Sequence, residues 1–216
     1  IKDMLDIYNK LLKKYGHRGW WPLYNSKTDK FEYKAIIPKT EEERLEICLG
    51  AILTQGTNWK NVEKALLNLI KNNLINKEKL IKINENKLSQ LIRSSGYYKQ
   101  KTRKIKEFVK FLESNKKVTR ENLLNIWGIG PETADSILLY AYKKPVFVID
   151  SYTKRIMERV GFKEKDYDEK SLFNEFYEVS KKIGINPQDF FKAAYKVLLN
   201  KEKGPKLAPF IIAIGK

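Results

Sequence analysis

Residues 123–134 read LLNIWGIGPETA, and residues 146–150 read VFVID. Gly128 and Gly130 permit a tight turn, because glycine adopts backbone angles that other residues avoid. Pro131 follows at once, and proline is tolerated in the first turn of a helix. The two stretches therefore predict a helix, a glycine hairpin, a second helix and then an extended apolar run that ends at an aspartate.

The glycine hairpin is a candidate site for an anion. Backbone N–H groups around Ile129, together with the N-terminus of the following helix, can surround a phosphate. The chain has 216 residues, with 43 lysines and arginines against 26 acidic residues and a formal net charge of +17. Such a charge favours polyanions, so a nucleic-acid backbone is the expected partner. An ordinary helix–helix turn and a lysine-rich solubilising surface are the alternatives that composition leaves open.

Most of the remaining chain repeats its apolar residues with the period of a helix. Thr40 and Glu43 form the pattern of a capping box, and a polar insert at 54–58 ends the helix that they begin. Residues 16–39, which contain glycine, proline and several aromatic residues, are expected to form an ordered loop with little regular structure. Further helices are predicted at 1–15, 77–83, 85–94, 98–114, 151–160, 168–183 and 187–199. The expected fold class is therefore all-α.

The chain contains one cysteine, Cys48, and one histidine, His17. A single cysteine excludes an internal disulfide and a four-cysteine zinc or iron–sulfur site, and a single histidine excludes the usual histidine metal clusters. We therefore expect no metal or other cofactor, and we expect a carboxylate where a general base is needed. No run of about 18 apolar residues is present, so we expect no membrane-spanning helix.

Residues 123–134 and 146–150 together resemble the helix–hairpin–helix and the Gly/Pro-rich loop with its aspartate in the endonuclease III (HhH-GPD) superfamily of DNA glycosylases. A second match is the segment GAILTQ at residues 50–55, which is similar to the family's segment ending in a helix-inserting glutamine. The resemblance runs from about residue 44 to residue 161, which is over half of the chain.

The resemblance implies an all-α, two-lobed fold with a central cleft. Residues 36–144 would form a six-helix lobe that contains the hairpin. Residues 1–35 and 145–216 would form a second helical lobe that carries the catalytic aspartate. The implied partner is double-stranded DNA with a damaged base, and we expect a monomer in the cytoplasm that associates with the nucleoid and not with a membrane.

Asp150 matches the catalytic aspartate of the family. A carboxylate beside the anomeric carbon stabilises the positive charge that develops on the sugar, and it can orient or deprotonate the attacking water. Aspartate is also a strong N-cap, so the alternative is that Asp150 only begins the helix at 151–160.

The resemblance also implies a set of DNA contacts. Gln55 matches the residue that fills the gap left by an extruded nucleotide, with a turn or capping role as its alternative. The implied DNA-binding residues are Gly128, Ile129, Gly130, Gln55, Thr133 and Lys154. Further candidates for phosphate contacts are Lys99, Lys101, Arg103 and Lys104.

Glu132 departs from the pattern of the bifunctional members, which carry a lysine at this position. That lysine attacks the sugar, forms a Schiff base and then cleaves the strand. A carboxylate cannot form an imine, so we expect base hydrolysis without lyase activity. Many relatives also end in four cysteines that hold an iron–sulfur cluster. Residues 204–216 contain no cysteine, so we expect no cluster.

Trp20, Trp21 and Pro22 resemble the subgroup that excises 3-methyladenine and lacks the lysine. In that subgroup an aromatic loop lines the base pocket, and an electron-rich indole suits a cationic alkylated purine. Core packing is the alternative role of the two tryptophans. The favoured function is a monofunctional DNA glycosylase of base excision repair for an alkylated purine such as 3-methyladenine. The rivals are an endonuclease III-like glycosylase and abasic-site lyase for oxidised pyrimidines, a mismatch-specific glycosylase, and a non-catalytic DNA-binding hairpin module.

Overall fold

The structure is a computed structural model that describes residues 4–16, 19–34, 37–159, 169–182, 184–192 and 206–209. The chain divides into two compact units, Ile1–Ile156 and Met157–Lys216, and each is described by itself. The expected second lobe, formed by both termini, stays a prediction.

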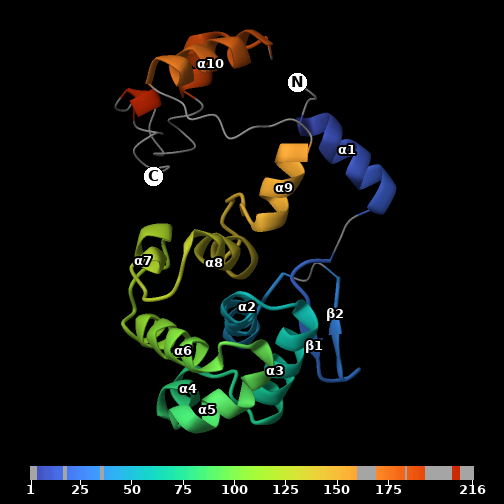
Figure 1. Ribbon diagram of the computed structural model, residues 1–216, viewed down its shortest axis with the longest axis vertical. Helices are drawn as coiled ribbons and strands as arrows, with labels where there is room; N and C mark the ends of the chain where they lie inside the picture. The colour runs from blue at the N-terminus through green and yellow to red at the C-terminus, as the bar shows by residue number, and fades with distance from the viewer. Residues whose placement is uncertain are drawn as a thin grey trace. The chain divides into compact units, whose positions relative to one another are not determined.

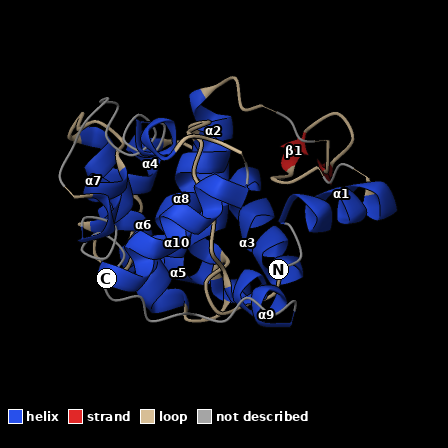
Figure 2. Cartoon of the chain, turned by 90° about the horizontal axis from the view of Figure 1, so that it is seen from above, coloured by secondary structure: helices blue, strands red, loops and turns tan. Residues whose placement is uncertain are grey.

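The described residues are mostly helical, as the sequence predicts. The elements of the first unit are α1 (Met4–Tyr15), β1 (Leu23–Asn25), β2 (Lys30–Glu32), α2 (Glu41–Leu53), α3 (Trp59–Lys71), α4 (Lys77–Lys82), α5 (Glu85–Leu91), η1 (Arg93–Ser95), α6 (Tyr98–Glu113), α7 (Arg120–Leu124), α8 (Pro131–Ser136) and η2 (Ile137–Ala141). Helix α9 (Ser151–Arg159) begins in this unit and α10 (Glu169–Lys182) lies in the second. Among the described residues, strands occur only in the β1–β2 hairpin, as Figure 2 shows.

Helix α2 is the centre of the first unit, where it contacts α3, α6, α8 and η2 (Figure 1). Its start is the predicted capping box: the Thr40 side chain accepts from the Glu43 backbone N–H, and the Glu43 side chain accepts from the Thr40 backbone N–H. Every residue from Leu45 to Leu53 is buried. A helix that is buried on all sides needs neighbours around its whole circumference, which explains why α2 carries the core.

The segment 16–39 differs from its prediction, because it contains a short antiparallel hairpin in which Tyr24 pairs with Phe31. The turn is built from local polar contacts: the Lys27 N–H donates to Asn25 Oδ1 at 2.9 Å, and the Tyr24 hydroxyl donates to Asp29 at 2.5 Å. Strands of three residues are too short to show an alternating pattern, so the sequence does not predict them.

The helix–glycine hairpin–helix lies where the sequence places it. Thr119 caps α7 by accepting from the Asn122 N–H at 3.2 Å. Gly128 has φ of 81°, which favours glycine, and Pro131 is the first residue of α8. Ile129 is buried and anchors the turn in the core.

The helix after the hairpin changes its hydrogen-bonding pattern. Beyond Ser136 it continues as a π-helix over Ile137–Ala141, in which the Tyr142 N–H donates to Ile137 O at 3.2 Å. Such wider turns are rare and occur often at functional sites. The predicted helix at 85–94 also differs, because it is divided into α5 and the 3-10 turn η1.

In the second unit, an aromatic cluster joins α10 to the helical residues 187–192. The members are Phe173, Phe176, Tyr177, Phe190 and Phe191, with ring centroids 5.0–6.1 Å apart. The rest of the predicted helix at 187–199 lies outside the described residues.

Candidate active site

One pocket of the first unit brings together six of the predicted site residues: Trp20, Trp21, Gln55, Glu132, Thr133 and Asp150. It has a volume of about 220 Å³. Its lining comes from the loop before β1, the end of α2, α8 with η2, and the start of α9. The lining residues are Trp20, Trp21, Ala51, Thr54, Gln55, Glu132, Thr133, Ser136, Tyr140, Val148, Asp150 and Thr153. The catalytic, base-pocket and DNA-inserting candidates therefore share one cavity, although up to 130 residues separate them (150 − 20).

Asp150 is half-buried at the start of α9, where it acts as an N-cap. Its Oδ1 accepts from the Thr153 N–H at 2.7 Å and from the Thr153 hydroxyl at 2.7 Å. Among the described residues no donor lies within hydrogen-bonding distance of Oδ2. The capping role and an active-site position are therefore compatible, because Asp150 lines the pocket and capping leaves Oδ2 without a donor among the described residues.

The charge of Asp150 affects two neighbours in the pocket. Burial raises the pKa of Glu132, and the nearby Asp150 carboxylate raises that pKa further. Burial also raises the pKa of the Tyr140 phenol, with a second contribution from Asp150. Both shifts favour the neutral forms of Glu132 and Tyr140 beside the Asp150 carboxylate.

The aromatic wall of the pocket is built by Trp20 and Trp21. Their ring centroids lie 4.9 Å apart, and Trp59 packs against both at 4.9 and 5.4 Å. Trp21 is 5% exposed and contacts Tyr140 at 5.5 Å, whereas Trp20 is 36% exposed. Trp21 therefore packs in the hydrophobic core and also lines the pocket. Pro22 is buried and does not line the pocket.

Gly50 explains how Trp21 comes so close to α2. A Cβ atom at this position would lie 3.0 Å from the indole ring of Trp21. The helix can therefore approach the ring only where a side chain is missing. This contact fixes the depth of the aromatic wall.

Gln55 connects the end of α2 to the glycine hairpin. Its Nε2 donates to Gly128 O at 3.2 Å and to Thr133 Oγ1 at 2.8 Å. Its Oε1 accepts from the Lys104 ammonium. In this state the side chain is held against the hairpin, so it would have to exchange these partners in order to enter DNA.

The hairpin offers fewer free amides than its sequence suggests. The Ile129 N–H donates to Ile126 O at 3.1 Å, which closes the turn and removes this amide as a phosphate donor. Among the described residues nothing accepts from the Gly128 or Gly130 N–H groups. Both amides are therefore able to hold an anion.

Two of the expected phosphate contacts have structural roles. Lys101 is 1% exposed and donates to Leu53 O and Ser95 O at 2.8 and 2.6 Å, so the expectation that it contacts DNA is wrong. Lys104 is half-buried, with its chain against Gly128 and its ammonium on Gln55. The buried Lys101 ammonium satisfies two main-chain carbonyls that would otherwise lack a partner.

The other basic candidates are exposed. Arg103 stacks its guanidinium 4.0 Å from the ring of Trp127, which directly precedes the hairpin and is 45% exposed. Lys99 is exposed near the start of α6, and Lys154 is exposed on α9. All three side chains lie on the surface of the first unit.

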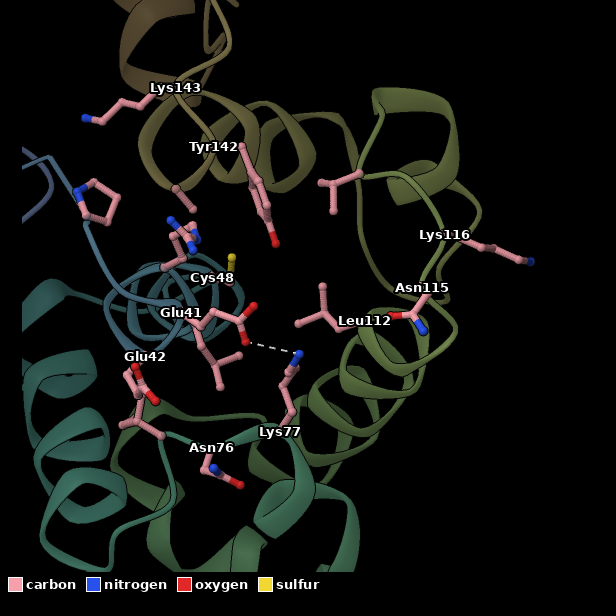
Figure 3. Close-up of a pocket in the computed structure, with 16 residues that line it drawn as sticks. Glu41, Glu42, Cys48, Asn76, Lys77, Leu112, Asn115, Lys116, Tyr142 and Lys143 are labelled. Carbon is pink, nitrogen blue, oxygen red and sulfur yellow. Dashed lines mark ion pairs between the residues drawn. The ribbon is translucent and has the colours of Figure 1, made fainter.

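A larger cavity of about 520 Å³ lies at the other end of α2 and contains none of the predicted site residues (Figure 3). Glu41 and Lys77, which both line it, form an ion pair of 3.3 Å. The side chains of Lys116 and Lys143 point away from it. Cys48 and Tyr142 lie at its centre, and burial raises the pKa of both. The smaller pocket therefore carries the candidate chemistry.

Within the part of the chain that the structure describes, no group of three or more His, Cys, Asp or Glu side chains could hold a metal ion. No described helix is long and apolar enough to cross a membrane.

Sequence reasoning did not single out Ser136, Tyr140 and Thr153, which also line the small pocket. Thr153 follows Asp150 by three residues, a spacing at which an N-cap side chain meets the helix backbone, so it could have been found. Tyr140 could not have been found from the sequence, because the direction of its side chain depends on the π turn.

The glycine hairpin and the carboxylate pocket both belong to the helical first unit, Ile1–Ile156. The family model of the HhH-GPD superfamily base excision DNA repair proteins matches residues 49–196. The chain belongs to this superfamily, and it is a DNA glycosylase of base excision repair.

Individual relatives agree with this assignment. A provisionally named DNA repair glycosylase of Methanocaldococcus jannaschii is 39% identical over 206 residues, which cover 89% of this chain and 84% of the relative. The structure is also similar to that of an H. pylori 3-methyladenine DNA glycosylase bound to 1,N6-ethenoadenine. That similarity has a TM-score of 0.55 and 31% identity over 75% of this chain and 80% of the other. A non-covalent endonuclease III–DNA complex shares the fold, with a TM-score of 0.59 at 19% identity, over 88% and 81% of the two chains.

Proposed function

We propose that this glycosylase hydrolyses the N-glycosidic bond of an extruded alkylated purine, such as 3-methyladenine, and leaves an abasic site in an intact strand. The observation that carries the proposal is one pocket that holds Asp150, the two indoles of Trp20 and Trp21, and Glu132. The protein would act as a monomer on double-stranded DNA.

Asp150 would act through Oδ2, the oxygen that accepts no hydrogen bond from the described residues. Breaking the bond between base and sugar builds positive charge on the deoxyribose, and a carboxylate beside the anomeric carbon lowers the energy of that state. The same carboxylate can orient the water that attacks the sugar. The base must leave the stack before this chemistry, at a cost of a few kcal/mol that phosphate contacts at the Gly128 and Gly130 amides would offset.

The choice of an alkylated purine rests on the electrostatics of the pocket. Purines methylated at ring nitrogens carry a positive charge, and indole rings attract cations through their π faces. The carboxylate of Asp150 adds negative charge beside these rings. The likeness to a glycosylase whose structure holds an ethenoadenine supports a purine in this position.

The proposed lack of lyase activity rests on Glu132. A Schiff base needs an amine that can reach the sugar carbon, and Glu132 supplies a carboxyl group in the pocket instead. Three lysines lie near Asp150 in the sequence and are the alternative nucleophiles. Lys144 donates to Val118 O, Lys143 is exposed and lines the larger cavity, and Lys154 is exposed on α9. None of the three lines the pocket that contains Asp150.

A panel of duplexes tests the proposal, each duplex carrying one lesion, with products separated before and after alkaline cleavage. We expect strand breaks at an alkylated purine only after alkali, and loss of base release in Asp150→Asn with DNA binding largely retained. Strand breaks without alkali, or a covalent DNA complex trapped by borohydride, would refute the monofunctional assignment. Faster release of an oxidised pyrimidine or of a mismatched base than of an alkylated purine would refute the proposed substrate.

A further inference from the structure

Thr153 makes two hydrogen bonds to one oxygen of Asp150. Its backbone N–H and its hydroxyl both donate to Oδ1, each at 2.7 Å. The residue is half-buried and lines the same pocket as Asp150, one turn further along α9. Because both bonds reach Oδ1, the other carboxylate oxygen is left without a donor among the described residues.

The two bonds differ in what they do for the helix. A cap requires only that the aspartate accept a backbone N–H of the first turn, and the Thr153 N–H meets that need. The first helical bond is also present, because the Lys154 N–H donates to Asp150 O at 3.0 Å. The hydroxyl bond therefore satisfies no backbone donor of α9. Its effect falls on the carboxylate itself.

That effect is orientation. The terminal torsion of an aspartate side chain is broad, so one hydrogen bond leaves the plane of the carboxylate free to turn. A second donor on the same oxygen removes this freedom, and threonine supplies it from a β-branched side chain with few χ1 states. Catalytic groups must be held to within about 0.5 Å of their productive position.

We propose that Thr153 is a positioning residue, which holds Oδ1 of Asp150 so that Oδ2 faces the deoxyribose of the extruded nucleotide. The proposal rests on the role of Asp150 in the proposed function. It adds that the hydroxyl group, and not only the backbone of α9, sets the geometry of the reacting oxygen.

The test compares Thr153→Val, which keeps the shape and removes the hydroxyl, with Thr153→Ser, which keeps the hydroxyl. The substrate is duplex DNA methylated by a small alkylating agent, and the rate constant of base release is measured with enzyme in excess. We expect Thr153→Val to lower this rate constant by about 10- to 100-fold, since small displacements of reacting groups cost this much. The affinity for DNA should change less than about twofold because Oδ2 is not used for binding. Thr153→Ser should restore most of the rate.

Matched variants separate the proposal from its premise. Thr28→Val removes a hydroxyl from the exposed β1–β2 turn and should leave the rate unchanged. A native rate in Thr153→Val, with Asp150→Asn inactive, would overturn the role of Thr153 and leave that of Asp150 intact. Equal losses in the valine and serine variants, or a loss confined to DNA affinity, would overturn it as well. A native rate in Asp150→Asn would instead remove the premise, the proposed role of Asp150.

Discussion

Replacing Glu46 with glutamine should change how the stability of the protein depends on pH. Glu46 lies on α2, is 8% exposed and accepts a hydrogen bond from the Tyr24 N–H at 2.8 Å, which attaches β1 to the central helix. Burial raises the pKa of Glu46 from 4.5 to about 7, and the hydrogen bond from Tyr24 opposes this shift only in part. Glutamine keeps the acceptor oxygen and cannot ionise.

The size of the effect follows from the pKa. A folded-state pKa raised by about 2.5 units corresponds to about 3 kcal/mol, at 1.36 kcal/mol per unit. The folded state binds the proton more tightly, so this contribution to stability is fully present below pH 4.5 and is lost as the pH rises through 7. At pH 4 the glutamine variant and the native protein should therefore have similar stability. At pH 8 the variant should be more stable by about 3 kcal/mol.

Urea denaturation at intervals between pH 4 and pH 8 measures this difference directly. Glu113→Gln, on the exposed end of α6, is the control for an amide substitution without burial. A stability difference between Glu46→Gln and the native protein that stays constant over this pH range would refute the reasoning. Such a result would mean that the pKa of Glu46 is the same in the folded and unfolded states.

Three further substitutions test other parts of the structure. Lys101→Met should lower the free energy of unfolding by about 2–4 kcal/mol in urea denaturation, because it leaves two buried carbonyls without donors; a smaller loss would mean that water replaces the ammonium. Gly50→Ala should slow base release, since the new methyl group would lie 3.0 Å from the Trp21 ring and displace it. A native rate of base release would show that the ring can move without affecting the pocket. Arg103→Ala should reduce the slope of log affinity for duplex DNA against log salt by about 0.9, as measured by anisotropy, if the guanidinium on Trp127 contacts a phosphate; an unchanged slope would exclude that contact.

Local signals in the sequence predict the framework of the fold. The capping box at Thr40, the cap at Thr119 and the first-turn proline at Pro131 depend only on residues within one helical turn, and all three are present. The glycine at 128 adopts the positive φ that its turn requires. These local features are present in the folded chain because no tertiary contact favours a different backbone conformation at these positions.

Features that depend on distant residues could not be predicted in this way. Lys101 looks like a surface cation, and its burial depends on carbonyls 48 and 6 residues away in the chain. The amide of Ile129 is used within the turn, which composition cannot show. For the candidate site, the resemblance supplied Asp150 and Gln55, whereas the pairing of Gln55 with Gly128 and Thr133 required the folded chain.

The π turn at Ile137–Ala141 makes the length of this segment a determinant of the pocket. A wider turn holds an additional residue, and each residue of an α-helix advances the side-chain direction by about 100°. Deleting one residue here would let an ordinary helix form and would rotate Tyr140 out of phase with Trp21. Substitutions within the segment should thus be tolerated more readily than any change in its number of residues. Insertions and deletions here would change the aromatic wall of the pocket beside Asp150, although Asp150 itself would be unchanged.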